Sequence, residues 1–214
     1  MSFKPSFFIN FFLVGLSLPV VIYAFDYYVL AKTWSPEFCL ENPNVCLLKP
    51  NPSFSLHGLW PQYKNGKYPS FCQPCEEFKK EKLNQLTGFI QKLWTNNGII
   101  NYDFLKHEWE KHGCCSNISL FNYFNASLKL AEKWNYLRVW QSIEINPSYE
   151  NKTISSSLME TTAKDFCGNK CDFALNCDNQ QYLSGYYMTL SKEFDVYNNS
   201  GIKGNCDENI YWEL

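Results

Sequence analysis

Several features that often reveal a protein's function are missing from this chain of 214 residues. The sequence contains no internal repeat, no low-complexity tract and no linker-like stretch, which favours a single domain. It also lacks a glycine-rich loop of the kind that cradles phosphates, and no serine or cysteine arrangement typical of a catalytic nucleophile is present. Histidine is scarce, with only three in the chain, but all three lie within two short motifs.

A strong charge of either sign is also missing. The formal net charge is −2 and the pI is about 5.9, so the whole molecule does not attract nucleic acid by its bulk charge. A polyanion would therefore have to bind at a local cluster of cationic groups. Aromatic residues make up 18% of the chain, and those outside the core offer surfaces on which bases can stack.

Residues 1–24 are typical of a secretory signal peptide. Lys4 supplies a short basic region, Phe7–Ile22 is almost wholly apolar, and Ala24 is a small residue at which a signal peptidase can cut. A membrane anchor is the alternative, but the run is short for a span and no second apolar stretch of that length follows. We expect cleavage after Ala24, a mature domain of residues 25–214, and no attachment to a membrane afterwards.

The chain has ten cysteines, an even number that is high for a cytosolic enzyme of this size. Behind a signal peptide, such a set predicts disulfides. Zinc is the competing interpretation, because Cys72-Gln-Pro-Cys75 and Cys167-Gly-Asn-Lys-Cys171 are closely spaced pairs. The two pairs are far apart in the chain, and an oxidising compartment disfavours free thiolates, so we expect disulfides and no metal. Four glycosylation sequons agree with export, and they begin at Asn117, Asn125, Asn151 and Asn198.

The hydrophobic patterns predict both strands and helices. Strand-like runs cover residues 25–33, 54–59 (stopped at Pro61) and 182–194, and a proline- and asparagine-rich loop with Cys39 and Cys46 separates the first two. Helical spacing covers residues 76–95, a segment from the N-cap Asn101 to Gly113, a segment from Ser119 that carries Phe124, Leu128 and Ala131 inward, and residues 156–166. Because strands and helices do not alternate strictly, we expect an α+β fold. In this fold an antiparallel β-sheet core has several helices packed around it and is cross-linked by disulfides.

The second histidine motif is His107-Glu-Trp-Glu-Lys-His-Gly113. On a helix, Glu108, Lys111 and His112 share one face and His107 lies at its edge, so a carboxylate, an ammonium and two imidazoles come close together. An exposed charged helix stabilised by Glu–Lys pairs is an equally common outcome. A zinc protease is disfavoured, since its two histidines stand four apart, whereas these stand five apart and point about 140° away from each other.

The first motif, Leu56-His-Gly-Leu-Trp-Pro61, places a histidine at the end of a predicted strand. Gly58 allows a close approach, and Trp60 offers a face for stacking. Alone, His57 is more often a satisfied core histidine than a catalytic one. Together, however, the two motifs supply two imidazoles that can exchange a proton, with an ammonium and a carboxylate to handle the charge of a phosphate.

With these two motifs, the chain resembles the T2 family of acid endoribonucleases, whose signature segments correspond to residues 56–61 and to residues 107–113 followed by Cys115. The similarity to plant members extends to Phe25-Asp-Tyr-Tyr28, to Trp34 with Cys39 shortly after, and to Tyr68-Pro-Ser-Phe-Cys72. It covers most of the mature chain. Trp34-Ser-Pro36 departs from the usual adjacent Trp-Pro, and Tyr186–Leu190 lacks an expected cysteine, but neither change touches the two motifs.

The resemblance implies a role for each matching residue. His112 would act as general base on the ribose 2′-hydroxyl, and His57 would protonate the leaving 5′-oxygen, which gives a 2′,3′-cyclic phosphate. Lys111 and Glu108 would stabilise the pentacoordinate phosphorane, and His107 would help to hold the phosphate. No cofactor is implied, the substrate is single-stranded RNA, and DNA is inert because it lacks the hydroxyl. With imidazole pKa values near ~6.5, we expect a mildly acidic optimum.

The family pattern also implies contacts and cross-links. Trp60 and Tyr68 would form the walls of a base pocket, although core packing suits both nearly as well. Gln62 stands where some relatives carry Asp, which leaves the base preference open. The pattern implies the disulfide Cys72–Cys115 and then Cys39–Cys46, and Cys75 and Cys114 are candidates for a bond alongside. The connectivity of the last four stays open, namely Cys167, Cys171, Cys177 and Cys206.

Three functions remain open at this point. The first is an active secreted or vacuolar ribonuclease, which we expect to be a monomer. The second is the same enzyme used as a pistil self-incompatibility toxin, against which the acidic pI weighs. The third is a catalytically silent storage or binding glycoprotein on the same fold, against which the complete motifs weigh.

Overall fold

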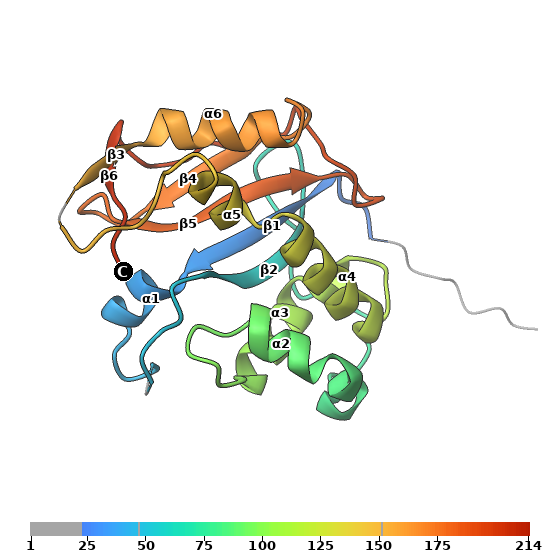
Figure 1. Cartoon of the computed structure of the whole chain (residues 1–214). Coiled ribbons are helices and arrows are strands. Elements are labelled where there is room, and N and C mark those ends of the chain that lie inside the picture. Colours follow the sequence, from blue (N-terminus) through green and yellow to red (C-terminus); the bar gives the residue numbers. More distant parts are fainter. Residues whose placement is uncertain (1–22, 47, 151) are drawn as a thin grey trace, which may run out of the picture.

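A twisted antiparallel sheet forms the centre of the protein (Figure 1). The computed structural model describes residues 23–46, 48–150 and 152–214. The four-stranded sheet has the order β2-β1-β5-β4, and a small second sheet pairs β3 with β6. The strands are β1 (Tyr27–Trp34), β2 (Phe54–Gln62), β3 (Thr153–Ser155), β4 (Phe173–Cys177), β5 (Leu183–Leu190) and β6 (Asn209–Tyr211). The α-helices are α1 (Ser35–Glu41), α2 (Thr87–Leu93), α3 (Tyr102–Lys111), α4 (Leu120–Lys133), α5 (Tyr136–Gln141) and α6 (Ser156–Phe166).

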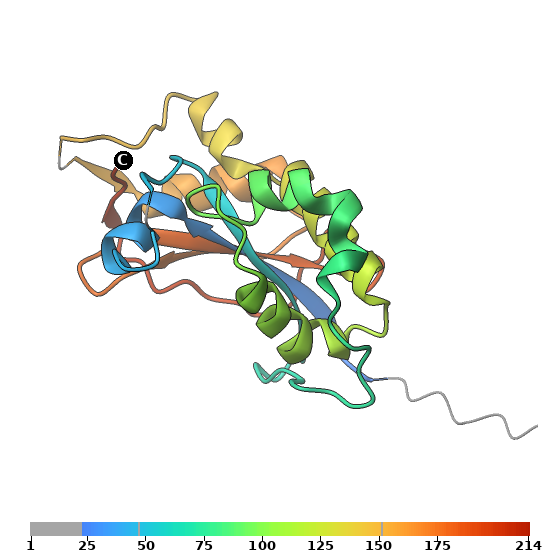
Figure 2. The same ribbon diagram turned by 90° about the horizontal axis from the view of Figure 1, so that it is seen from below.

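Strand β1 is central and is buried on both faces, as its aromatic and apolar sequence predicts. Successive side chains of β1 point to opposite faces of the sheet, so they pack into two different hydrophobic clusters. Tyr28, Leu30 and Trp34 enter the main core beneath most of the helices. Tyr27 and Val29 enter a smaller cluster on the other face, where the chain that leads to β6 covers the sheet (Figure 2).

Strand β2 carries the first histidine motif, and it ends later than predicted. It continues beyond Leu59 and Pro61 to Gln62, which pairs with Tyr27. Proline is tolerated here because β2 is an edge strand. A register shift opposite Ala31 and Lys32 makes His57 an extra residue in the ladder, and such bulges change the direction of a side chain.

The predicted α+β class is confirmed, and so are most of the predicted elements. Asn101 caps α3 and Ser119 caps α4 through their side chains, and the inward residues Phe124, Leu128 and Ala131 of α4 are buried. Helix α6 covers residues 156–166 as expected.

Four details differ from the expected elements. The helix expected from Glu76 starts only at the 3-10 helix η1 (Lys80–Leu86), because Glu76 is held by bonds from the Leu120 amide and the Trp109 indole. Helix α3 ends at Lys111, and the 3-10 helix η2 (Gly113–Cys115) follows. The expected loop with Cys39 contains α1, whose Pro36 suits a first helical turn. Of residues 182–194, β5 takes only Leu183–Leu190, and β4 was not predicted.

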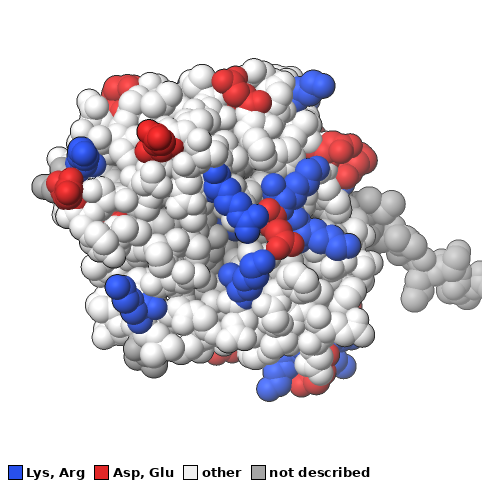
Figure 3. Space-filling model, in the orientation of Figure 1, with Lys and Arg blue, Asp and Glu red and all other residues white. Residues whose placement is uncertain are grey.

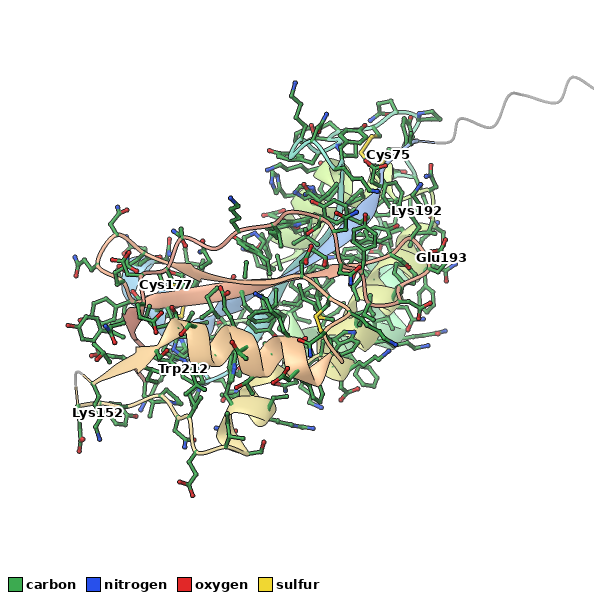
Figure 4. All side chains as sticks on the ribbon, turned by 90° about the horizontal axis from the view of Figure 1, so that it is seen from above. Cys75, Lys152, Cys177, Lys192, Glu193 and Trp212 are labelled. Carbon is green, nitrogen blue, oxygen red and sulfur yellow. A yellow bond between two sulfur atoms is a disulfide. The ribbon has the colours of Figure 1, made fainter. Side chains whose placement is uncertain are left out.

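All ten cysteines form disulfides. Cys72–Cys115 and Cys39–Cys46 are confirmed, Cys75–Cys114 lies alongside the first, and the open set resolves as Cys167–Cys171 and Cys177–Cys206. Two bridges therefore tie the loop after β2 to η2, just beyond the end of α3, whereas the one at Cys177 lies toward the other side of the molecule from Cys75 (Figure 4).

Charge is unevenly distributed over the surface despite the small net charge. Basic side chains gather near the centre of the face in Figure 3, around a smaller acidic group. Among the described residues, no helix combines the length and the apolar character that a membrane span requires. The predicted signal peptide lies outside the described residues except for Tyr23 and Ala24.

Candidate active site

One cavity of about 630 Å³ brings both histidine motifs together. Strand β2 contributes one wall, the following loop a second and α3 a third. All eight residues predicted to act in catalysis or substrate binding line it, and they are His57, Trp60, Gln62, Tyr68, His107, Glu108, Lys111 and His112. The two motifs are far apart in the sequence, so their meeting is the central geometric result.

Helix α3 presents its two faces to different environments. Leu105 and Trp109 are 1% exposed and anchor the helix in the main core. Glu108 and His112 turn toward the cavity but are only 2% and 4% exposed, whereas His107 is exposed and Lys111 is half-buried. The cavity thus holds two titratable groups, Glu108 and His112, that have lost most of their contact with water.

Trp60 contacts the acid–base groups of both motifs. Its indole N–H donates to Glu108 Oε2 at 2.8 Å. The ring of His57 meets it edge-on at 5.1 Å between centroids, and the ring of His112 stacks on it at 5.2 Å with an interplanar angle of 29°. Both imidazoles are therefore held against one indole, and Tyr68 approaches His112 from another side at 5.8 Å.

Gly58 makes this arrangement possible. A Cβ atom at this position would collide with the carboxylate of Glu108 and the indole of Trp60. The close approach predicted for this glycine is confirmed.

Two residues that the sequence did not single out position His57. The Thr33 hydroxyl lies 3.3 Å from Nδ1, and Phe104 packs against the ring at 5.3 Å. On the other side, Nε2 lies 3.7 Å from Glu108 Oε1. Phe104 precedes Glu108 by four residues, so helical periodicity would have placed it on the same face; nothing in the sequence pointed to Thr33.

Burial shifts the pKa values of the three central groups. It raises the pKa of Glu108 to about 7, although the hydrogen bond from Trp60 and the positive charge of Lys111 both lower that pKa. It lowers the pKa of His57 to about 4 and that of His112 to about 3, and nearby Lys111 lowers both further. At mildly acidic pH, the free site therefore has two neutral imidazoles and a protonated carboxyl.

A second cavity of about 620 Å³ adjoins the first. His57 and Phe104 line both, so they form the partition between them. Its other walls include Thr33, Trp94 and Asn96. The sequence did not predict this cavity. A cluster of three carboxylates, Glu37, Glu41 and Asp178, lines neither cavity.

Comparisons with known proteins agree with this geometry. The model of the ribonuclease T2 family matches residues 25–206. Ribonuclease 3 of Arabidopsis thaliana is 31% identical over 201 residues, which cover 87% of this chain and 88% of that protein. Ribonuclease 1 of the same plant is 34% identical over 148 residues, 64% of either chain. The crystal structure of RNase NT in complex with 5′-AMP shares the fold, with a TM-score of 0.74 at 24% identity over 89% of this chain and 98% of that one.

The family match spans most of the chain and includes both histidine motifs. The chain therefore belongs to the ribonuclease T2 family and is a ribonuclease of that type.

Proposed function

We propose that this enzyme cleaves single-stranded RNA without a metal, by transferring the phosphodiester to the ribose 2′-hydroxyl. The bond between O2′ and phosphorus forms, the bond between phosphorus and O5′ breaks, and a 2′,3′-cyclic phosphate results. The observation that carries the proposal is the single cavity that His57, Lys111 and His112 share with Glu108. Because the nucleophile belongs to RNA, DNA is not a substrate.

His112 acts as the general base in this proposal. Its Nδ1 is buried without a hydrogen-bond partner among the described residues. The low pKa of about 3 keeps the ring neutral and able to accept the proton of O2′ over the whole mildly acidic range.

His57 acts as the general acid and must be charged when the 5′-oxygen leaves. In the free site burial keeps its pKa at about 4, so that the proton resides on Glu108 instead. A phosphate monoanion in the cavity favours the imidazolium, and Glu108 supplies the proton when its Oε1, 3.7 Å from Nε2 in the free site, closes to hydrogen-bond distance. Substrate binding then creates the acid that the second half of the reaction needs.

Lys111 and His107 provide positive charge for the phosphate. Lys111 carries no ion pair with any residue of 23–46, 48–150 or 152–214, so its ammonium is available to the equatorial oxygens of the phosphorane. His107 lies exposed at the cavity mouth. Glu108 stays neutral until it passes its proton to His57, so it adds no negative charge to the cavity before the imidazolium forms.

Two base-binding regions flank the phosphate. Trp60, Gln62 and Tyr68 surround the side of His112, where the nucleoside that carries the attacking hydroxyl binds. The second cavity begins at His57, the residue that protonates the 5′-oxygen, so it accepts the leaving nucleoside. That RNase NT binds 5′-AMP supports a nucleotide ligand here.

The test uses the dinucleotide UpU and its 2′-deoxy analogue across a range of pH. We expect a mildly acidic optimum, cyclic phosphate as first product, no cleavage of the analogue, and loss of at least about a hundredfold in kcat for His57→Ala and His112→Ala. Circular dichroism checks that both variants fold. Near-normal turnover of either variant, or an optimum well above pH 8, would refute these roles.

We also propose export and glycosylation of the chain. Asn117 and Asn198 are exposed, whereas Asn125 is half-buried on α4 and Asn151 lies outside the described residues. The Asn117 side chain makes two hydrogen bonds of 2.7 Å to the backbone of Tyr23, and cleavage after Ala24 would remove that partner. Mass spectrometry of protein from a secreting host, before and after an N-glycosidase, checks the cleavage site and the occupied asparagines.

A further inference from the structure

A wall of the catalytic cavity comes from neither histidine motif. Ser200, Gly201, Ile202 and Lys203 line the cavity from the stretch of chain between β5 and β6. The proposed chemistry assigns them no role. Their position in the cavity nevertheless gives them access to whatever RNA extends beyond the cleaved bond.

The wall is preformed. The Asp172 carboxylate accepts from both the amide and the hydroxyl of Ser200 at 2.6 Å, and Ser200 is 8% exposed. Tyr197 stacks on Tyr27 of β1 with centroids 5.3 Å apart and an interplanar angle of 14°. Ile202 packs against the same small apolar cluster of the sheet. These contacts fix the backbone that carries Lys203, so little ordering is needed on binding.

Lys203 is the one exposed cation on this wall. It makes no ion pair with any residue in the described part of the chain. Of the described residues that line the cavity, Glu108 is the one carboxylate, and burial keeps that group protonated at mildly acidic pH. Because no described carboxylate pairs with it, this ammonium is free to bind an anionic ligand.

The wall lies on the base-binding side of the scissile bond. Ile202 packs against the apolar cluster that contains Tyr27, and the ladder partner of Tyr27 is Gln62. By contrast, no residue of 200–203 lines the second cavity, which His57 shares on the leaving side. A strand that places its attacking ribose near His112 thus continues toward Lys203 in the 5′ direction.

We propose that Lys203 binds the phosphate on the 5′ side of the nucleotide whose 2′-hydroxyl attacks, and so forms a subsite for longer RNA. This inference rests on the proposed function. The subsite acts on binding, and Lys203 takes no part in the proton transfers. It gives an acidic protein a local means to hold a polyanion.

The experiment compares UpU with its 5′-phosphorylated form pUpU, which differ by the upstream phosphate alone. For Lys203→Gln we expect KM for pUpU to rise about three- to fivefold, toward the value for UpU, with kcat unchanged and UpU kinetics unaffected. Lys203→Arg should keep the preference. The salt dependence of poly(U) cleavage should weaken in Lys203→Gln by roughly 0.7 in log–log slope.

Lys152→Gln is the matched control. Lys152 is exposed, lines neither cavity and lies at the opposite end of the molecule from Cys75 in Figure 4. Equal effects of Lys203→Gln on both substrates, or no effect on either, would overturn the subsite while leaving the catalytic roles intact. Failure of the wild-type enzyme to cleave UpU would instead overturn the proposed function, and the subsite with it.

Discussion

Glu108 loses nearly all contact with water on folding, and replacing it with Gln tests how much that burial costs. Burial raises its pKa from an ordinary value of 4.5 to about 7, so the folded protein holds a proton there that the unfolded chain releases. The free energy of unfolding therefore falls as pH rises from about 4.5 to 7. Gln keeps an oxygen that can accept from the Trp60 indole but cannot ionise.

The magnitude follows from the two pKa values. At about 1.4 kcal/mol per pKa unit, the ionisation of Glu108 lowers stability by roughly 2–3 kcal/mol more at pH 8 than at pH 5. The quantity to compare is the free energy of unfolding of Glu108→Gln minus that of the wild type. We expect this difference to be larger at pH 8 than at pH 5 by about that amount, in favour of the variant. The same substitution should reduce turnover, because the amide cannot pass a proton to His57, so stability and activity change in opposite directions.

The assay is urea unfolding followed by tryptophan fluorescence at the two pH values, with the disulfides intact. Glu110→Gln is the matched control, because Glu110 lies on the same helix but is exposed and pairs with Lys106. Its effect should be small and similar at both pH values. A difference between Glu108→Gln and wild type that does not change from pH 5 to pH 8 would refute the reasoning.

Three further substitutions test individual contacts. Gly58→Ala should lower both stability and activity, since its Cβ would collide with Glu108 and Trp60; a melting temperature and turnover equal to wild type would contradict the packing. Lys32→Met should raise stability below pH 7 by at least about 1 kcal/mol, roughly 2–4 °C in Tm, because Lys32 is 4% exposed and burial lowers its pKa to about 7. That pKa is below the unfolded value, so the gain should shrink as pH rises toward 10.5, and a loss of stability at pH 6 would count against it. Thr33→Val should reduce kcat severalfold with little change in Tm, by freeing the His57 ring, and an unchanged kcat would remove Thr33 from the positioning role.

Local signals explain why much of the helical structure could be predicted. Asn101 and Ser119 each cap a helix through their own side chain, and periodic apolar residues follow each cap, so the information lies within a few residues. The predicted start at Glu76 was wrong because that residue is fixed by Leu120 and Trp109, which are distant in sequence. Propensity describes a segment in isolation, and tertiary contacts override it.

The candidate site divides in the same way. His107, Glu108, Lys111 and His112 share a helical stripe, so their grouping could be predicted from spacing alone. The meeting of that stripe with His57 depends on β2 pairing with β1 one residue out of step, and no local pattern encodes such a register. The wall at Lys203 depends on even longer connections, through Asp172 to Ser200 and through Tyr27 to Tyr197. The sequence motifs thus contain the residues to which we assign the chemistry, whereas the wall that carries Lys203 forms only when distant segments fold together.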